Sequence, residues 1–145
     1  MKVTNFLLYL FLTLLSVPAF SQTAIKNNKN IVLNKTFKAR IGFMCVETSR
    51  PQPCSGYMVY LELNFKNDFV LVNEKNENAC GVRSENKYKT NYSIQGNIVK
   101  VEKLTRYGEP LKIKQLIYAK NSLTGKTTNT DGGETEYIFE EIKTK

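Results

Sequence analysis

The feature that most constrains the fold is an alternation of apolar and polar residues with a period of two. From Thr36 onward this alternation is rich in β-branched and aromatic residues, and Asn, Gly, Asp and Pro interrupt it at short intervals. The clearest case is Lys87 to Gln95, where one face carries Tyr88, Thr90, Tyr92 and Ile94. Side chains two apart share a face of a strand, so this pattern predicts an all-β domain whose strands bury one face.

Turn residues divide the pattern into hairpins. Gly96-Asn97 suits a tight turn with positive φ, and it leads into a strand from Ile98 to Lys103. Earlier in the chain, Lys66-Asn67-Asp68 separates a strand from Tyr57 to Phe65 from a returning strand at Phe69 to Asn73. Both patterns predict antiparallel pairing between neighbours in the sequence.

Further strands are expected at Thr36 to Met44, Leu111 to Ala119 and Glu134 to Ile142. The stretch from Lys120 to Gly133 is either an eighth strand or a long loop. The short connections predict an antiparallel meander of about seven to eight strands. Because no helical segment is available to cover the apolar face, we expect the sheet to close into a small β-barrel in preference to a tight sandwich.

In a meander, alternate connections emerge at the same end. The tight turns should therefore share one end, and the longer loops, Cys45 to Gly56, Glu74 to Asn86 and Thr105 to Pro110, should share the other. Arg and Tyr contribute much of the energy of protein interfaces. The candidate partner-binding residues on these loops are Arg50, Arg83, Arg106 and Tyr107.

The three cysteines, Cys45, Cys54 and Cys80, fall in the same group of loops. In an oxidising compartment we expect one disulfide among them, stabilising the fold by about 2 to 4 kcal/mol and leaving one thiol. Spacing does not decide the pairing, although a bridge involving Cys80 is slightly favoured because it would tie two loops together. A zinc site is not expected, since the chain has no histidine and no Cys-x-x-Cys pair.

The first 21 residues have the pattern of a cleavable secretory signal. Lys2 precedes an apolar run from Phe6 to Val17, and Ala19-Phe20-Ser21 places small residues where a signal peptidase acts. The run is shorter than the roughly 20 residues of a membrane-spanning helix. We expect cleavage before Gln22, a secreted or periplasmic location, a flexible polar leader at residues 22–30, a single domain at residues 31–145 and no transmembrane segment after cleavage.

Composition narrows the function classes. Loss of Lys2 with the signal lowers the formal charge from +8 to +7, but the acidic residues are interleaved with the basic ones, so nucleic acid is not expected as a partner. The absence of histidine removes the commonest general base and metal ligand. The sequence therefore predicts a protein that is not an enzyme and that needs no cofactor.

The order of elements resembles the lipocalin-like domains of small secreted bacterial proteins. The resemblance rests on Leu63-Asn64-Phe65 with its polar turn, on the hairpin from Tyr92 to Val99 and on Tyr137-Ile138-Phe139. The Gly-x-Trp signature of such domains is absent, and Lys35-Thr36-Phe37 stands in its place. The resemblance implies an up-and-down barrel able to hold a small apolar ligand, and it assigns no functional residue.

These observations lead to the hypothesis of a non-enzymatic binding module. It would recognise a small apolar ligand inside the barrel, or an envelope or extracellular macromolecule at the long-loop end. The residues expected to line a cavity are Tyr57, Phe65, Tyr88, Tyr92 and Phe139. The alternative is an inhibitor or structural envelope protein with a filled barrel, acting through loops held by a disulfide.

Overall fold

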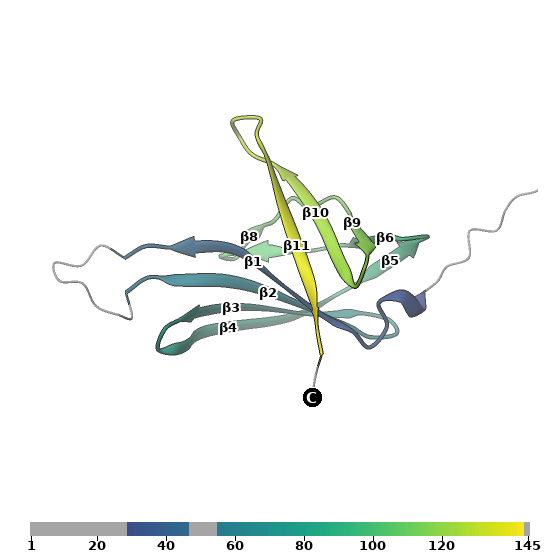
Figure 1. The fold of residues 1–145 in the computed structure, drawn as a ribbon, viewed down its shortest axis with the longest axis horizontal. Coiled ribbons are helices and arrows are strands. Elements are labelled where there is room, and N and C mark those ends of the chain that lie inside the picture. The colour runs from purple at the N-terminus through teal and green to yellow at the C-terminus, as the bar shows by residue number, and fades with distance from the viewer. Residues whose placement is uncertain (1–28, 47–54, 144–145) are drawn as a thin grey trace, which may run out of the picture.

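The computed structural model describes residues 29–46 and 55–143, and regular structure within them is antiparallel β-sheet apart from one short 3-10 helix (Figure 1). The predicted signal peptide lies outside the described residues. Among those described, no helix is long and apolar enough to cross a membrane. The elements are η1 (Lys29–Ile31), β1 (Thr36–Met44), β2 (Tyr57–Phe65), β3 (Val70–Asn78), β4 (Gly81–Thr90), β5 (Tyr92–Gln95), β6 (Ile98–Val101), β7 (Thr105–Arg106), β8 (Glu109–Pro110), β9 (Leu116–Ala119), β10 (Ser122–Thr128) and β11 (Glu134–Ile142).

Nine strands form one strongly curled sheet in the order β4-β3-β2-β1-β11-β10-β9-β6-β5, and β7 and β8 form a separate two-stranded sheet. The all-β antiparallel prediction is confirmed. The predicted closed barrel is wrong, because β4 and β5 are the two edges of an open half-barrel and do not pair with each other. β4 and β5 are consecutive in the sequence and are separated only by Asn91, a connection too short for them to pair with each other. β4 therefore pairs with β3, and β5 pairs with β6.

Several strand predictions are confirmed. β1, β2 and β11 have the predicted bounds, and the stretch at residues 120–133 contains a strand, β10. The turn before β10 consists of Lys120 and Asn121, which have φ values of 48° and 64°. The predicted strand at Leu111 to Ala119 is regular only in β9, and the residues ahead of it include Leu111 and Ile113, which are buried in the core.

The predicted loop from Glu74 to Asn86 is wrong. β3 and β4 pair along this whole stretch, from Glu74 opposite Asn86 to Asn78 opposite Gly81. The register shifts once, between Asn76 and Glu77, at a β-bulge. Residues from Gly81 to Lys87 are all exposed, so this part of β4 has no apolar alternation for a sequence pattern to detect. Pairing with β3, rather than burial, defines this strand.

One face of the curled sheet, called here the inner face, carries the hydrophobic core. Phe37, Phe65 and Phe139 are its largest fully buried side chains. The ring of Phe65 meets those of Phe37 and Tyr92 edge to face, with centroids 5.9 and 5.1 Å apart. Phe65 and Phe139, expected to line a cavity, are thus packed core residues.

This packing predicts a large difference between buried and exposed phenylalanines. Phe65→Ala should lower the free energy of unfolding by about 3 to 5 kcal/mol, because it removes a buried ring and leaves a cavity. Phe43→Ala is the matched control: Phe43 is 68% exposed, and its loss should change stability by no more than about 0.5 kcal/mol. Urea unfolding of both variants measures the difference, and equal losses would contradict this description of the core.

Candidate functional site

Large apolar side chains are exposed together where β1 ends, β2 begins and β3 turns into β4, at the left of Figure 1. We call this region the apolar end. Its members are Phe43, Met44, Val46, Met58 and Val82, with exposed fractions of 68, 41, 42, 40 and 58%. Contiguous exposed apolar residues are unusual on soluble monomers and mark sites of interaction. The apolar end is therefore the first candidate for a binding site.

A β-bulge in β1 places Phe43 on the surface. Phe37, Ala39 and Ile41 alternate on the inner face, and simple alternation would bury Phe43 as well. The register shifts between Arg40 and Gly42, so that Phe43 pairs with exposed Met58. An extra residue in one strand moves the following side chains to the opposite face. The bulge thus converts a core position into an exposed aromatic one.

A groove of about 540 Å³ lies at the apolar end. Its apolar wall includes Phe43, Met58 and the ring of Tyr60, and Glu77 supplies a carboxylate. The remaining lining residues are Met44, Cys45, Val46, Ser55, Gly56, Tyr57, Asn78 and Ala79. A concave, mainly apolar surface with few polar groups has the character of a ligand or anchor-residue pocket.

The β7–β8 hairpin lies across the inner face of the sheet. Its turn is Tyr107-Gly108, with φ of 56° and 80°, as a two-residue hairpin requires. Glu74 on β3 is only 6% exposed, and the hairpin supplies donors to both of its oxygens. Tyr107 N donates to Oε1 at 2.7 Å, and Thr105 Oγ1 donates to Oε2 at 3.3 Å. These bonds stabilise a carboxylate that would otherwise be buried without partners.

The same turn reaches β1 and β11. Arg106 Nη1 donates to the carbonyl of Ile41 at 3.4 Å and to the hydroxyl of Tyr137 at 3.3 Å. Tyr107 Oη donates to the carbonyl of Phe43 at 3.1 Å. Burial raises the pKa of the Tyr107 hydroxyl above its ordinary value.

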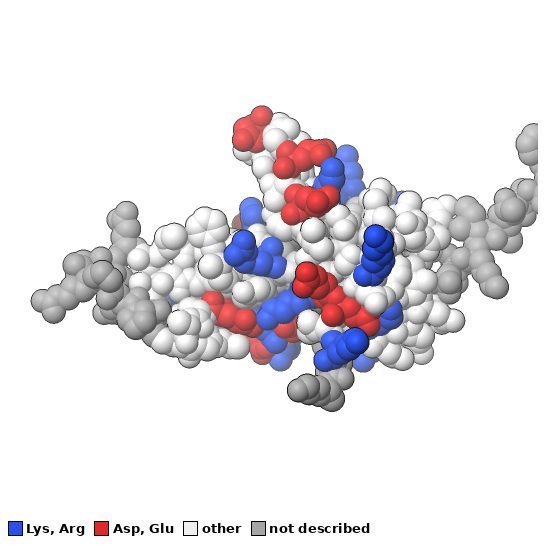
Figure 2. Space-filling model, viewed as in Figure 1, with Lys and Arg blue, Asp and Glu red and all other residues white. Residues whose placement is uncertain are grey.

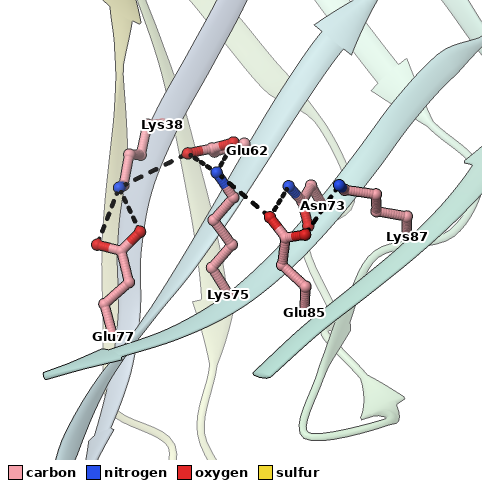
Figure 3. A network of polar contacts seen from close by, with 7 residues as sticks. All are labelled: Lys38, Glu62, Asn73, Lys75, Glu77, Glu85 and Lys87. Carbon is pink, nitrogen blue, oxygen red and sulfur yellow. Dashed lines mark hydrogen bonds and ion pairs between the residues drawn. The ribbon is translucent and has the colours of Figure 1, made fainter. Parts of the chain in front are cut away.

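On the outer face, charged side chains of β1 to β4 form a network (Figure 3). Lys38 Nζ lies 3.0 Å from Glu77 and 3.6 Å from Glu62. Lys75 lies 2.9 Å from Glu62, and the resulting hydrogen bond raises the pKa of Lys75. On the face that Figure 2 shows, positive and negative groups lie side by side and form no single basic patch. This mixture matches the prediction of interleaved charges.

Of the four predicted partner-binding residues, the structure describes Arg83, Arg106 and Tyr107, and Arg50 lies outside the described residues. Arg83 stacks over the ring of Tyr57, with 5.7 Å between the guanidinium carbon and the ring centroid. Arg106 and Tyr107 lie together on the β7–β8 hairpin and form hydrogen bonds with β1, β3 and β11.

The tyrosines predicted to line a cavity make polar contacts at the edges of the core. Tyr57 Oη donates to the sulfur of Met44 at 2.9 Å. Tyr88 accepts a bond from Thr105 N at 3.0 Å, and Tyr92 donates to the carbonyl of Lys66 at 2.7 Å. Each hydroxyl therefore connects segments that are distant in the sequence.

Sequence reasoning did not single out Phe43, Met44, Met58 or Glu74. The first three were part of strands predicted to alternate, and Glu74 stood in a predicted loop. The bulge that exposes Phe43 has no residue signature of its own, because Arg40, Ile41 and Gly42 also fit an uninterrupted strand. In an uninterrupted strand Ile41 and Phe43 would share a face, so period-two alternation gives no sign that Phe43 is exposed.

Two of the three cysteines, Cys45 and Cys80, are among the described residues. Cys45 is exposed and has a free thiol, so neither pairing that uses Cys45 is formed. Cys80 is not among the free thiols, and Cys54 lies outside the described residues. No disulfide joins two cysteines within residues 29–46 and 55–143. The bridge expected from the sequence stays a prediction, and Cys54 with Cys80 is the pairing left open to it.

Searches for related proteins found no matching family model, no matching curated protein and no matching solved structure. Among the described residues, no group of three His, Cys, Asp or Glu side chains is placed to hold a metal ion. The site is therefore interpreted from its own geometry.

The outer-face network predicts an acidic titration for Glu85. Hydrogen bonds from Lys87 and then Asn73 lower the pKa of this carboxyl from 4.5 to about 2. Since the pKa is lower in the folded protein, the interaction stabilises the fold above the unfolded-state pKa, and this contribution is lost as the pH falls towards 2. NMR titration of the Glu85 carboxyl measures the midpoint. Lys87→Gln should raise it, and Lys126→Gln, which removes a distant ion pair, should not.

The cysteines predict a simple count of thiols. Without reductant, the folded protein should take up one equivalent of maleimide, at Cys45, because this thiol is exposed. After reduction and unfolding it should take up three equivalents. Peptide mapping by mass spectrometry locates the label, and rapid labelling of Cys80 before reduction would contradict a bridge between Cys54 and Cys80.

Proposed function

We propose that this protein is an exported, non-enzymatic binding module that holds a protein partner at its apolar end. The observation that carries the proposal is the joint exposure of Phe43, Met44, Val46, Met58 and Val82. Burying such side chains against a partner removes apolar surface from water, at about 25 cal/mol per Å². A polar outer face with paired charges adjoins them, as the rim of an interface does.

The packing of the inner face favours recognition outside the sheet over a ligand held inside it. Leu61, Phe65, Val72 and Phe139 are fully buried there. The β7–β8 hairpin occupies part of the same face through its bonds to Glu74. A filled interior is also expected of the alternative function, an inhibitor or structural envelope protein. The proposed binding module and this alternative would both contact their partners through the outer surface of the molecule.

The groove beside Phe43 gives the partner a defined kind of contact. Its volume of about 540 Å³ accommodates a large apolar side chain, and such an anchor in a pocket dominates the energy of many interfaces. The formal charge of +7 after export favours an acidic partner by steering its approach. We therefore expect a partner that presents an apolar anchor within an acidic surface.

The described carboxylates support a role in binding more than one in catalysis. Glu74 is the one buried acidic side chain within the described residues, and both of its oxygens accept bonds from the β7–β8 hairpin. Glu62 and Glu77 are paired with lysines. With no histidine in the chain, neither arrangement offers the usual general base.

The test is capture of the partner by the exported protein with substitutions at the apolar end. The double variant Phe43→Ser, Met58→Ser should lose at least tenfold in affinity, because two exposed apolar contacts are removed without disturbing the core. Ile138→Ser is the matched control: Ile138 is 53% exposed on β11, away from the groove. Partners are identified by mass spectrometry, and affinities are measured with the purified partner.

Two outcomes would contradict the proposal. The partner could be retained by the double variant and lost by Ile138→Ser, which would place the interface elsewhere. Native mass spectrometry of the protein from its own compartment could instead show a small molecule that leaves on activation. That result would favour a small apolar ligand over a protein partner.

A further inference from the structure

β1 loses one of its two neighbours before it reaches the apolar end. β2 pairs with β1 from Thr36 to Met44, but β11 pairs with it only from Thr36 to Lys38. Beyond Lys38, β11 diverges from β1, as Figure 1 shows. The last part of β1, which carries Phe43 and Met44, therefore has a neighbouring strand on one side only.

Side chains of the β7–β8 turn supply donors to this part of β1. The carbonyls of Ile41 and Phe43 accept bonds from Arg106 Nη1 and Tyr107 Oη, at 3.4 and 3.1 Å. Carbonyls two residues apart on a sheet edge ordinarily accept backbone N–H groups from an adjacent strand. Here two side-chain donors act in place of that strand.

The other side of the turn is anchored on the opposite part of the sheet. Tyr107 N donates to buried Glu74 at 2.7 Å, and Thr105 is bonded to both Glu74 and Tyr88. These partners lie on β3 and β4, whereas the carbonyls lie on β1. The turn thus spans the inner face from one group of strands to the other.

The absence of a side chain at Gly42 shows that this contact is close. A Cβ at Gly42 would lie 3.0 Å from Tyr107 Oη, so the turn approaches β1 at a position without a side chain. The φ of +56° at Tyr107 belongs to the two-residue turn of the hairpin itself.

We propose that the Arg106-Tyr107 turn is a strap that holds the apolar end in its binding conformation. The strap fixes the carbonyls of Ile41 and Phe43 relative to Glu74, and so sets where Phe43 and Met44 lie. When the strap is released, the end of β1 loses its second support and partner binding weakens. The link to partner binding rests on the proposed function, whereas the structural role of the strap can be tested without a partner.

The first test is a double-mutant cycle between Gly42 and Tyr107. Gly42→Ala should lower the urea midpoint of unfolding, because the new Cβ presses on Tyr107 Oη. Tyr107→Phe removes that oxygen and leaves ring and side-chain carbons at 3.5 Å or more, which is ordinary contact. Gly42→Ala should therefore be tolerated in the Tyr107→Phe background. An equal loss in both backgrounds would overturn the close contact on which the strap depends.

The second test is amide hydrogen exchange in β1, measured by NMR on the purified exported protein. Tyr107→Phe should accelerate exchange from Ile41 to Met44 by about tenfold, the effect of losing one hydrogen bond. Exchange in the centre of β2, at Leu61, should be unchanged. The control is Tyr118→Phe, which removes a hydroxyl bonded to Lys35 and Asn121, away from this part of β1. Unchanged exchange from Ile41 to Met44 would overturn the proposal.

Partner affinity separates this inference from the proposed function. If Tyr107→Phe accelerates exchange in β1 and also weakens the partner that Phe43→Ser, Met58→Ser loses, the strap controls the binding surface. If exchange accelerates but affinity for that partner is unchanged, the control of binding is refuted while the proposed function stands. If the double variant loses no partner, the proposed function fails, and the exchange result alone decides whether the strap exists.

Discussion

The aromatic contacts around Phe65 hold the two halves of the curled sheet together. Phe65 lies on β2, and its ring meets those of Phe37 on β1 and Tyr92 on β5. β1 is next to β2 in the sheet, whereas β5 is an edge strand that lies six positions from β2 in the strand order. The hydroxyl of Tyr92 also donates to the carbonyl of Lys66. Strands far apart in the sheet order are thus brought into contact through side chains. The curl depends on this packing, because no hydrogen-bonded ladder joins β4 to β5 within the described residues.

An open half-barrel has edge strands, which a closed barrel does not have. Closure gives every strand two neighbours, whereas an open or divergent sheet leaves edges with unpaired backbone groups. β4 limits such an edge with charged side chains and a bulge near its start. β1 has a different solution, since Arg106 and Tyr107 donate to its carbonyls where β11 has diverged. The β7–β8 hairpin therefore supplies side-chain donors to β1 where β1 has no second neighbouring strand.

The sequence allowed good prediction wherever burial alternates. In β2, the residues Tyr57, Val59, Leu61, Leu63 and Phe65 were placed on one face, and the last four are buried there. The strand at residues 87–95 was recognised for the same reason, although the chain breaks it at Asn91 to change partners. A pattern of apolar residues reports which face is buried, but it carries no information on which neighbour a strand pairs with. This is why strands were found and barrel closure was predicted wrongly.

The candidate site was predicted less well, because it depends on departures from alternation. Arg106 and Tyr107 were predicted to bind a partner from a loop at the long-loop end, and they lie instead on the β7–β8 hairpin across the inner face. Their hydrogen bonds are made within the protein. Phe43, the most exposed residue of the apolar end, is turned outward by the bulge after Arg40.

The bulge and the strap depend on each other. The shifted register turns Phe43 outward and brings Gly42 to the inner face, where the absent side chain admits Tyr107. The same shift that exposes the ring of Phe43 thus creates the space for the Arg106-Tyr107 turn. A chain without the bulge would bury Phe43 and exclude Tyr107 together, so the exposure of Phe43 and the contact of the turn with β1 both arise from a single extra residue in β1.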